Sequence, residues 1–130
     1  MSSAVEIVAD TSVWIDHLER DAVPTLAAAL LQDRVVLSPL VVAELVTGAV
    51  SLEQRQLIGE LLQDVPLHLT TLGHWLRVGE LRQRLLRHGL KVTLPDAHIA
   101  QCALDRNAVL LSRDAIFARI AKHVPLRLGT

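Results

Sequence analysis

Short apolar runs alternate along the chain with longer amphipathic segments. Residues 5–9, 34–37 and 108–111 are brief and rich in β-branched or aliphatic side chains, which is typical of strands buried on both faces. A brief extended piece is predicted at 65–69 and a terminal strand at 125–128. The pattern therefore predicts several short strands separated by helices.

The segments between these strands carry helix signals. Ser38 followed by Pro39 predicts a helix start, because serine accepts a backbone N–H and proline suits the first helical position. Helices are predicted over 13–20, 21–32, 39–47, 51–63, 71–89 and 94–106, with a last one capped by 112–114. Because strands alternate with helices, we expect an α/β fold with a parallel sheet covered by helices on both faces.

Length and composition favour one domain spanning residues 1–130, without repeats or linkers. The hydrophobic share is 51%, but no apolar run approaches the roughly 20 residues of a membrane span. Met1–Ala4 lead straight into the first strand, without a basic segment followed by an apolar one. We therefore expect no secretory signal, no membrane partner and a cytoplasmic location.

Charge and cysteine content exclude little. Thirteen basic and fourteen acidic residues nearly cancel, so only local charge can indicate a nucleic-acid partner. Cys102 is the single cysteine and lies in an apolar helical stretch, where a buried core residue is expected. The aromatic side chains are few, so an RNA contact would have to depend on phosphates.

Four carboxylates stand where this fold would bring them together: Asp10, Glu44, Asp96 and Asp114. Asp10 ends the first strand and Asp114 follows strand 108–111, and the carboxyl ends of parallel strands meet at one edge of a sheet. If these strands are neighbours, about 4.8 Å apart, the two acids can share a cation. Glu44 and Asp96 lie in helical segments that can reach the same edge.

Such a cluster favours a divalent metal. Two bare charges about 4 Å apart repel by roughly 4 kcal/mol at an effective dielectric of 20. A hard ion such as Mg²⁺ or Mn²⁺ would turn this repulsion into affinity. Each acid also has a simpler role open to it: Asp10 and Asp114 as helix caps, Asp96 as a first-turn acid, and Glu44 as a rim residue reaching solvent.

The segments that carry the acids resemble the PIN-domain ribonucleases, specifically the VapC-type toxins of bacterial type II toxin–antitoxin pairs. The matching segments are VADTSVWID (8–16), LSPLVVAEL (37–45) with Gly48, PDAHIA (95–100), and LLSRD (110–114) with Phe117. They occur in order and at the expected spacing over nearly the whole chain. The resemblance implies a PIN-like three-layer sandwich with a parallel sheet of about five strands.

The resemblance also implies an activity: a Mg²⁺-dependent endoribonuclease, with Mn²⁺ as the other metal, that cleaves RNA with a metal-activated water. Both catalysis and metal binding then fall to Asp10, Glu44, Asp96 and Asp114. Thr11 and Ser112 match hydroxyl positions that support the site. Many relatives have a further Asp where this chain has Ile116, so a second metal would be held more weakly.

Basic side chains between residues 65 and 95 suggest how RNA is gripped. Arg84 and Arg87 on the predicted helix, and Arg113 beside the last acid, are the candidates for phosphate contact. A solvated helix C-terminus is the alternative for the first two. The six histidines show no metal-ligand spacing, and we expect His98 to be at the surface or partly packed.

Three other functions remain open from sequence. An aspartyl-nucleophile phosphatase or phosphotransferase would use Asp10, but its second Asp is replaced by Ser12. A receiver-like domain would need a lysine after a late strand, and neither Lys91 nor Lys122 follows one. The third is an interaction domain without catalysis.

The resemblance implies two protein partners as well, a cognate VapB-like antitoxin and a second copy of the chain in a homodimer. The antitoxin would wrap an apolar groove and place a basic side chain in the acidic pocket. Leucine-rich segments near 25–31 and 57–62 are candidates for this groove, with ordinary core packing as the alternative.

Overall fold

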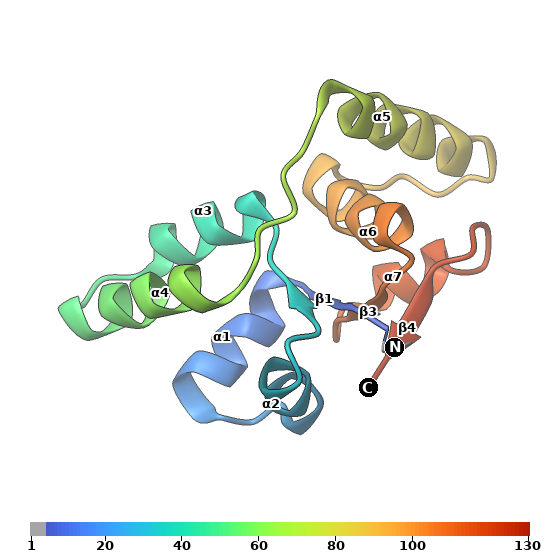
Figure 1. The fold of residues 1–130 in the computed structure, drawn as a ribbon. Coiled ribbons are helices and arrows are strands. Elements are labelled where there is room, and N and C mark those ends of the chain that lie inside the picture. Colours follow the sequence, from blue (N-terminus) through green and yellow to red (C-terminus); the bar gives the residue numbers. More distant parts are fainter. Residues whose placement is uncertain (1–4) are drawn as a thin grey trace.

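A computed structural model describes residues 5–130 of the chain. Within that range one parallel sheet has the strand order β2-β1-β3-β4 (Figure 1). Its strands are β1 (Ile7–Ala9), β2 (Val35–Val36), β3 (Val109–Leu111) and β4 (Arg127–Gly129). The piece expected at 65–69 contributes a single parallel bridge, between Leu37 and Leu67, beside β2. The prediction of a parallel sheet of about five strands is therefore confirmed, with the fifth reduced to this bridge.

Helices cover both faces of the sheet, as predicted. They are α1 (Thr11–Arg20), α2 (Pro24–Leu31), α3 (Pro39–Gly48), α4 (Leu52–Asp64), α5 (Leu72–Arg87), α6 (Leu94–Arg106) and α7 (Ala115–Ile120). Figure 1 shows α5 and α6 on one side of the strands and α1 and α2 on the other. Helix α6 packs on β1 and β3 and against α5, while α2 packs on β1 and β2.

Local signals in the sequence fix most helix ends. Ser38 accepts the backbone N–H of Leu40 at 3.1 Å, and Asn107 ends α6 in the left-handed conformation with φ 52°. The helix predicted from residue 21 begins only at Pro24. Asp21 has φ 49° and closes α1 as its C-cap, so it cannot also be helical in α2.

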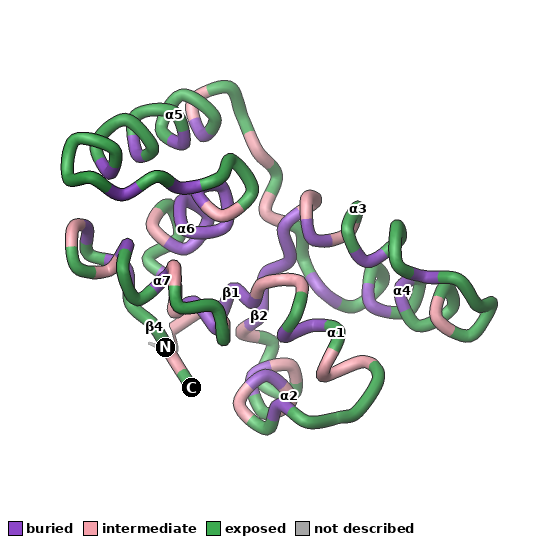
Figure 2. Tube along the Cα trace, turned by 180° about the vertical axis from the view of Figure 1, so that it is seen from behind, coloured by how far each residue is buried: buried purple, intermediate pink, exposed green. Residues whose placement is uncertain are grey.

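The core lies between the sheet and the inner faces of the helices, while the outer turns of α4 and α5 are exposed (Figure 2). Trp14 and Phe117 are its largest fully buried side chains, and Cys102 is fully buried as predicted. None of the helices between residues 5 and 130 combines the length and apolar character needed to cross a membrane. The expectation of no secretory signal concerned Met1–Ala4, which lie outside the described residues.

Gly59→Ala is expected to raise the free energy of unfolding by about 0.5–1 kcal/mol, because glycine is a poor helix former. Gly59 is exposed in the middle of α4, and an added Cβ would meet no other described atom within 4 Å. Urea unfolding measures the change. Gly89→Ala is the opposing control: Gly89 has φ +75°, so the same substitution should destabilise the protein there.

Candidate functional site

One open hollow at the carboxyl edge of the sheet gathers all four acids. It is lined by Asp10, Thr11, Ser12, Glu44, Pro95, Asp96, Ile99 and Asp114. Asp10 follows β1, Asp114 follows β3, Glu44 projects from α3, and Asp96 lies in the first turn of α6. Side chains more than 100 positions apart in sequence therefore face a common space, which we call the acidic hollow.

Strand pairing explains how the first and last acids meet. Strands β1 and β3 are neighbours, with Ala9 opposite Leu111, and the Asp10 N–H donates to the Leu111 carbonyl at 3.1 Å. Both acids also cap the helix that follows them. Asp10 Oδ1 accepts the Val13 N–H at 3.1 Å, and Asp114 Oδ1 accepts the Ile116 N–H at 3.0 Å. Each carboxylate therefore caps a helix and also lines the hollow, so the two roles are compatible.

Hydroxyl groups hold these carboxylates in place. Thr11 Oγ1 donates to Glu44 Oε1 at 2.7 Å, and Ser112 Oγ donates to Asp10 Oδ2. Ser112 Oγ also accepts the Asp114 N–H at 3.0 Å, so this one side chain contacts both strand-end acids. Ser12 was not among the predicted site residues, yet its hydroxyl donates to Asp10 Oδ1 at 2.9 Å. Its position two residues after the acid, at a helix start, was the available signal.

The four acids of the hollow interact electrostatically. Burial raises the pKa of Asp96 above its ordinary value, and the negative charges of Asp114, Asp10 and Glu44 raise it further, while a hydrogen bond with Thr93 acts in the opposite direction. Glu44 itself is exposed, because its neighbours Val41 and Leu45 take the buried face of α3. It therefore occupies the rim of the hollow and reaches solvent, which was the simpler of its two predicted positions.

The donor set suits a hard divalent cation. Every ionisable group that lines the hollow is a carboxylate, and the other polar side chains there are the hydroxyls of Thr11 and Ser12. Oxygen ligands of this kind are the ones preferred by Mg²⁺ and Mn²⁺. Burial first, and then the neighbouring carboxylates, raise the pKa of Asp96, so its negative charge is costly here and a cation would relieve this cost.

The predicted RNA-contacting arginines are not among the residues that line the hollow. Arg113 forms an ion pair with Asp16, and Arg84 donates to the His123 carbonyl at 3.3 Å. Arg87 is exposed in the last turn of α5. Ile116, which stands where many relatives have an acid, packs against the core.

Two apolar depressions lie beside α4. The first, between α1, α3 and α4, is lined by Ile15, Leu18, Glu19, Glu44, Leu45, Gly48, Ala49, Gln54, Leu57 and Ile58, and we call it the α3–α4 groove. It shares Glu44 with the acidic hollow. The second lies between α2 and α4 and includes Leu30, Leu31, Leu57 and Leu61. Parts of both leucine-rich segments are therefore open to solvent, whereas Leu26 and Ile58 belong to the core.

The expectation for His98 was wrong. Only 1% of this residue is exposed, and so is 1% of His74. The two rings come from α6 and α5, the helices in closest mutual contact, and hydrogen-bond to each other inside that interface. The spacing of residues within one helix does not predict a hydrogen bond between histidines of two different helices.

Comparisons with known proteins agree with this architecture. The PIN domain profile matches residues 7–123. Among solved structures, VapBC2 from Rickettsia felis bound to a promoter DNA fragment has a TM-score of 0.77 at 22% identity, over 95% of this chain and 96% of that one. For DNA-bound VapBC from Salmonella typhimurium the TM-score is 0.74 at 22% identity, covering 97% and 98%.

A third structure, VapBC-1 from nontypeable Haemophilus influenzae, has a TM-score of 0.72 at 26% identity and covers 95% of this chain and 96% of its own. No curated protein sequence matches the chain. The similarity is thus one of fold over almost the full length, at low sequence identity.

Proposed function

Because the chain belongs to the PIN domain family, we propose that it is a VapC-type toxin: a Mg²⁺- or Mn²⁺-dependent endoribonuclease held in check by a cognate VapB-like antitoxin. The observation that carries the proposal is the acidic hollow, which gathers Asp10, Glu44, Asp96 and Asp114 at the carboxyl edge of a parallel sheet. The family match favours this activity over an aspartyl phosphatase, a receiver-like domain or a domain without catalysis.

The four acids are the proposed metal ligands and catalytic residues. When bound, a divalent ion would lower the pKa of a water molecule and neutralise charge on the leaving oxygen. A carboxylate of the hollow can take a proton from the attacking water. Thr11 and Ser112 fix the orientation of Glu44 and Asp10 through the hydrogen bonds described above, and Ser12 does the same for Asp10. No covalent bond between enzyme and RNA is required.

Phosphate contacts would position the RNA. Arg113 is next to Asp114 in sequence, and its side chain is 59% exposed although it pairs with Asp16. An exposed ion pair contributes little, so an RNA phosphate can replace Asp16 as its partner. Arg84 and Arg87 lie farther along α5 and remain proposed contacts for a longer RNA. Arg77 is not a candidate for phosphate contact, since it donates two hydrogen bonds to Asp105.

The α3–α4 groove is the proposed seat of the antitoxin. The solved relatives named above are complexes of this kind by their names, and the groove offers an apolar floor formed by Leu45 and Ile58. Glu44 stands where the groove meets the acidic hollow. An apolar antitoxin segment in the groove can therefore extend a basic side chain toward the acids, which would exclude a metal by charge.

A homodimer is also proposed. Trp75 and Leu76 lie three and four residues after Leu72 on α5. The exposed fractions of Leu72, Trp75 and Leu76 are 75%, 40% and 59%. Neighbouring apolar side chains on an outer helix face are costly in water and favour burial against another surface. A second copy of this chain is the occupant implied by the family.

Addition and removal of divalent metal ions test the proposed function directly. Addition of Mg²⁺ or Mn²⁺ to metal-free protein should raise the melting temperature, because at 100 times Kd a ligand adds about 2.7 kcal/mol to the stability of the folded state. The same ions should start the cleavage of RNA, and a chelator should stop it. Sequencing of the RNA ends produced by brief expression in cells would identify the target.

Two results would contradict the proposal. One is a melting curve that does not respond to either ion. The other is RNA cleavage that continues at full rate after the metal has been removed. An Asp96→Asn protein is the control for the thermal measurement, since it keeps the fold elements but weakens the acid cluster.

A further inference from the structure

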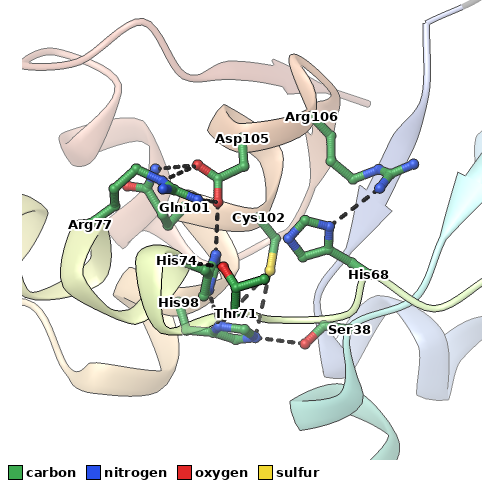
Figure 3. A network of polar contacts seen from close by, with 10 residues as sticks. All are labelled: Ser38, His68, Thr71, His74, Arg77, His98, Gln101, Cys102, Asp105 and Arg106. Atoms are coloured by element: carbon green, nitrogen blue, oxygen red, sulfur yellow. Dashed lines mark hydrogen bonds and ion pairs between the residues drawn. The ribbon is translucent and has the colours of Figure 1, made fainter.

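A second polar cluster lies inside the α5–α6 interface, apart from the acidic hollow (Figure 3). At its solvent-facing end Asp105 accepts His74 Nδ1–H at 2.8 Å and Gln101 Nε2–H at 2.8 Å. Arg77 donates two more hydrogen bonds to the same carboxylate, at 2.9 and 3.0 Å. Although burial opposes ionisation, these donors hold the pKa of Asp105 well below its usual value. Asp105 is therefore a fixed anion that orients the His74 ring.

This orientation directs the other ring nitrogen of His74 toward His98. With Nδ1 facing Asp105, His74 Nε2 lies 2.8 Å from His98 Nδ1. His98 Nε2 lies 2.7 Å from Ser38 Oγ. Burial, reinforced by His74 and His68, lowers the pKa of His98 to about 4, so its ring is neutral near pH 7. The two rings thus face one another inside the protein, where only 1% of each residue is exposed.

Cys102 and His68 complete the cluster. Cys102 Sγ lies 3.9 Å from His98 Nδ1, and ligand atoms of His68, His74 and Cys102 all lie within 4.8 Å of one another. His68 Nε2 is buried but has no hydrogen-bond partner among the described residues. A buried ring nitrogen without a partner is destabilising, so His68 Nε2 is available to bind a further group.

We propose that His68, His74 and Cys102 form a binding site for a soft divalent transition metal, with Zn²⁺ as its expected occupant and His98 as the fourth ligand. This inference is independent of the proposed nuclease activity. The ligand set of imidazoles and one thiolate selects zinc over magnesium. It therefore differs in chemistry from the carboxylates of the acidic hollow.

Binding of a metal requires the side chains to rearrange, since His98 is not among the three residues whose ligand atoms lie within 4.8 Å of one another. Ring nitrogens that share a tetrahedral zinc stand roughly 3.3 Å apart, given metal–nitrogen distances of about 2.0–2.1 Å, so His74 and His98 would separate slightly from their present 2.8 Å. The His98 proton would move to Nε2 and be donated to Ser38 Oγ, which frees Nδ1 for the metal. Asp105 would continue to accept from His74 Nδ1, the usual support for a metal-bound histidine.

Two features set the cost of binding. Burial raises the pKa of the Cys102 thiol to about 12, so metal binding must expel its proton to solvent. The Arg106 guanidinium lies 3.4 Å from His68 Nδ1, which would need to carry a proton when Nε2 binds metal. Arg106 can turn from His68 without losing its charge partner, because Glu6 already accepts two hydrogen bonds from it, at 3.0 and 2.8 Å.

Co²⁺ is the probe, because a cobalt–thiolate bond gives a charge-transfer band and tetrahedral cobalt gives intense visible bands. We expect the reduced, full-length protein to bind one Co²⁺ with both signatures, and Zn²⁺ to displace it. His68→Gln and Cys102→Ser should each weaken the site by at least about tenfold, the lower range for disturbing a metal's surroundings. Asp96→Asn, which changes only the acidic hollow, should leave the band unchanged.

Circular dichroism and thermal melting establish that each variant is folded. If Cys102→Ser does not fold, His68→Gln decides, since His68 lies in the segment between α4 and α5 and outside the His74–His98 pair. Loss of the band in folded His68→Gln supports the site. The absence of a thiolate band in the wild-type protein, or an unchanged cobalt affinity in His68→Gln, would overturn it. The cobalt band should persist in Asp96→Asn, so it tests the zinc site independently of the acidic hollow. A failure of the nuclease proposal would therefore leave the cobalt result unchanged.

Discussion

Asp10→Asn is expected to abolish RNA cleavage while the protein remains folded. Asp10 is held by Ser12, Ser112 and the N–H of Val13, and it stands at the end of the central strand β1. Asparagine keeps an oxygen for the helix cap but removes the negative charge that would bind the metal. We expect a loss of about 3 kcal/mol or more in transition-state stabilisation, which is a hundredfold or larger fall in rate.

The measurement is the rate of RNA cleavage at saturating Mg²⁺, with thermal melting in chelator as the fold control. Without metal the variant should melt at the same temperature or higher, because one of four mutually repelling charges is gone. Asp33→Asn is the matched control, since Asp33 precedes β2 at the opposite edge of the sheet and should retain full activity. Full activity of Asp10→Asn would refute the assignment.

Acidification from pH 6.5 to 4 is expected to remove about 3 kcal/mol of stability through His98 alone. His98 is 1% exposed, and burial lowers its pKa from 6.5 to about 4 in the folded protein. The unfolded chain therefore binds a proton in this range that the folded protein does not, so stability falls as pH falls. His68 has a lowered pKa for the same reason and acts in the same direction. Below about pH 4, protonation of Asp105 removes further stability, since its pKa is lowered by folding.

Asp96 contributes with the opposite sign. Burial, together with the neighbouring carboxylates, raises its pKa on folding, so the folded protein takes up this proton more readily than the unfolded chain. Urea unfolding of wild type and Asp96→Asn in chelator, at several pH values from 7 to 4, separates the two effects. Asp96→Asn should show the steeper loss. A free energy of unfolding that stays level in both proteins between pH 6.5 and 4 would contradict the argument.

The acidic hollow was largely predictable because its signals are local. Asp10 and Asp114 directly follow strand-like runs, and parallel strands place their carboxyl ends at one edge. What the sequence did not state was that the two strands are neighbours, which depends on the order of the sheet. The same holds for Glu44, whose exposure follows from the face of α3 that packs inward.

The histidine cluster was not predictable for the opposite reason. His74 and His98 are 24 positions apart on separate helices, and only the packing of α5 on α6 brings their rings together. The late start of α2 has a local cause that the apolar pattern hides, namely the left-handed conformation of Asp21. Hydrophobic periodicity reports which residues are buried, and it does not report which polar groups will meet inside.

Glu44 belongs both to the α3–α4 groove and to the acidic hollow. Anything that changes the charge at this carboxylate from one side must alter the affinity for whatever binds on the other, by an equal factor in each direction. Under the proposed function, a bound ion would loosen the antitoxin as strongly as the antitoxin expels the ion. The cellular supply of free magnesium would then help set how readily the toxin is released.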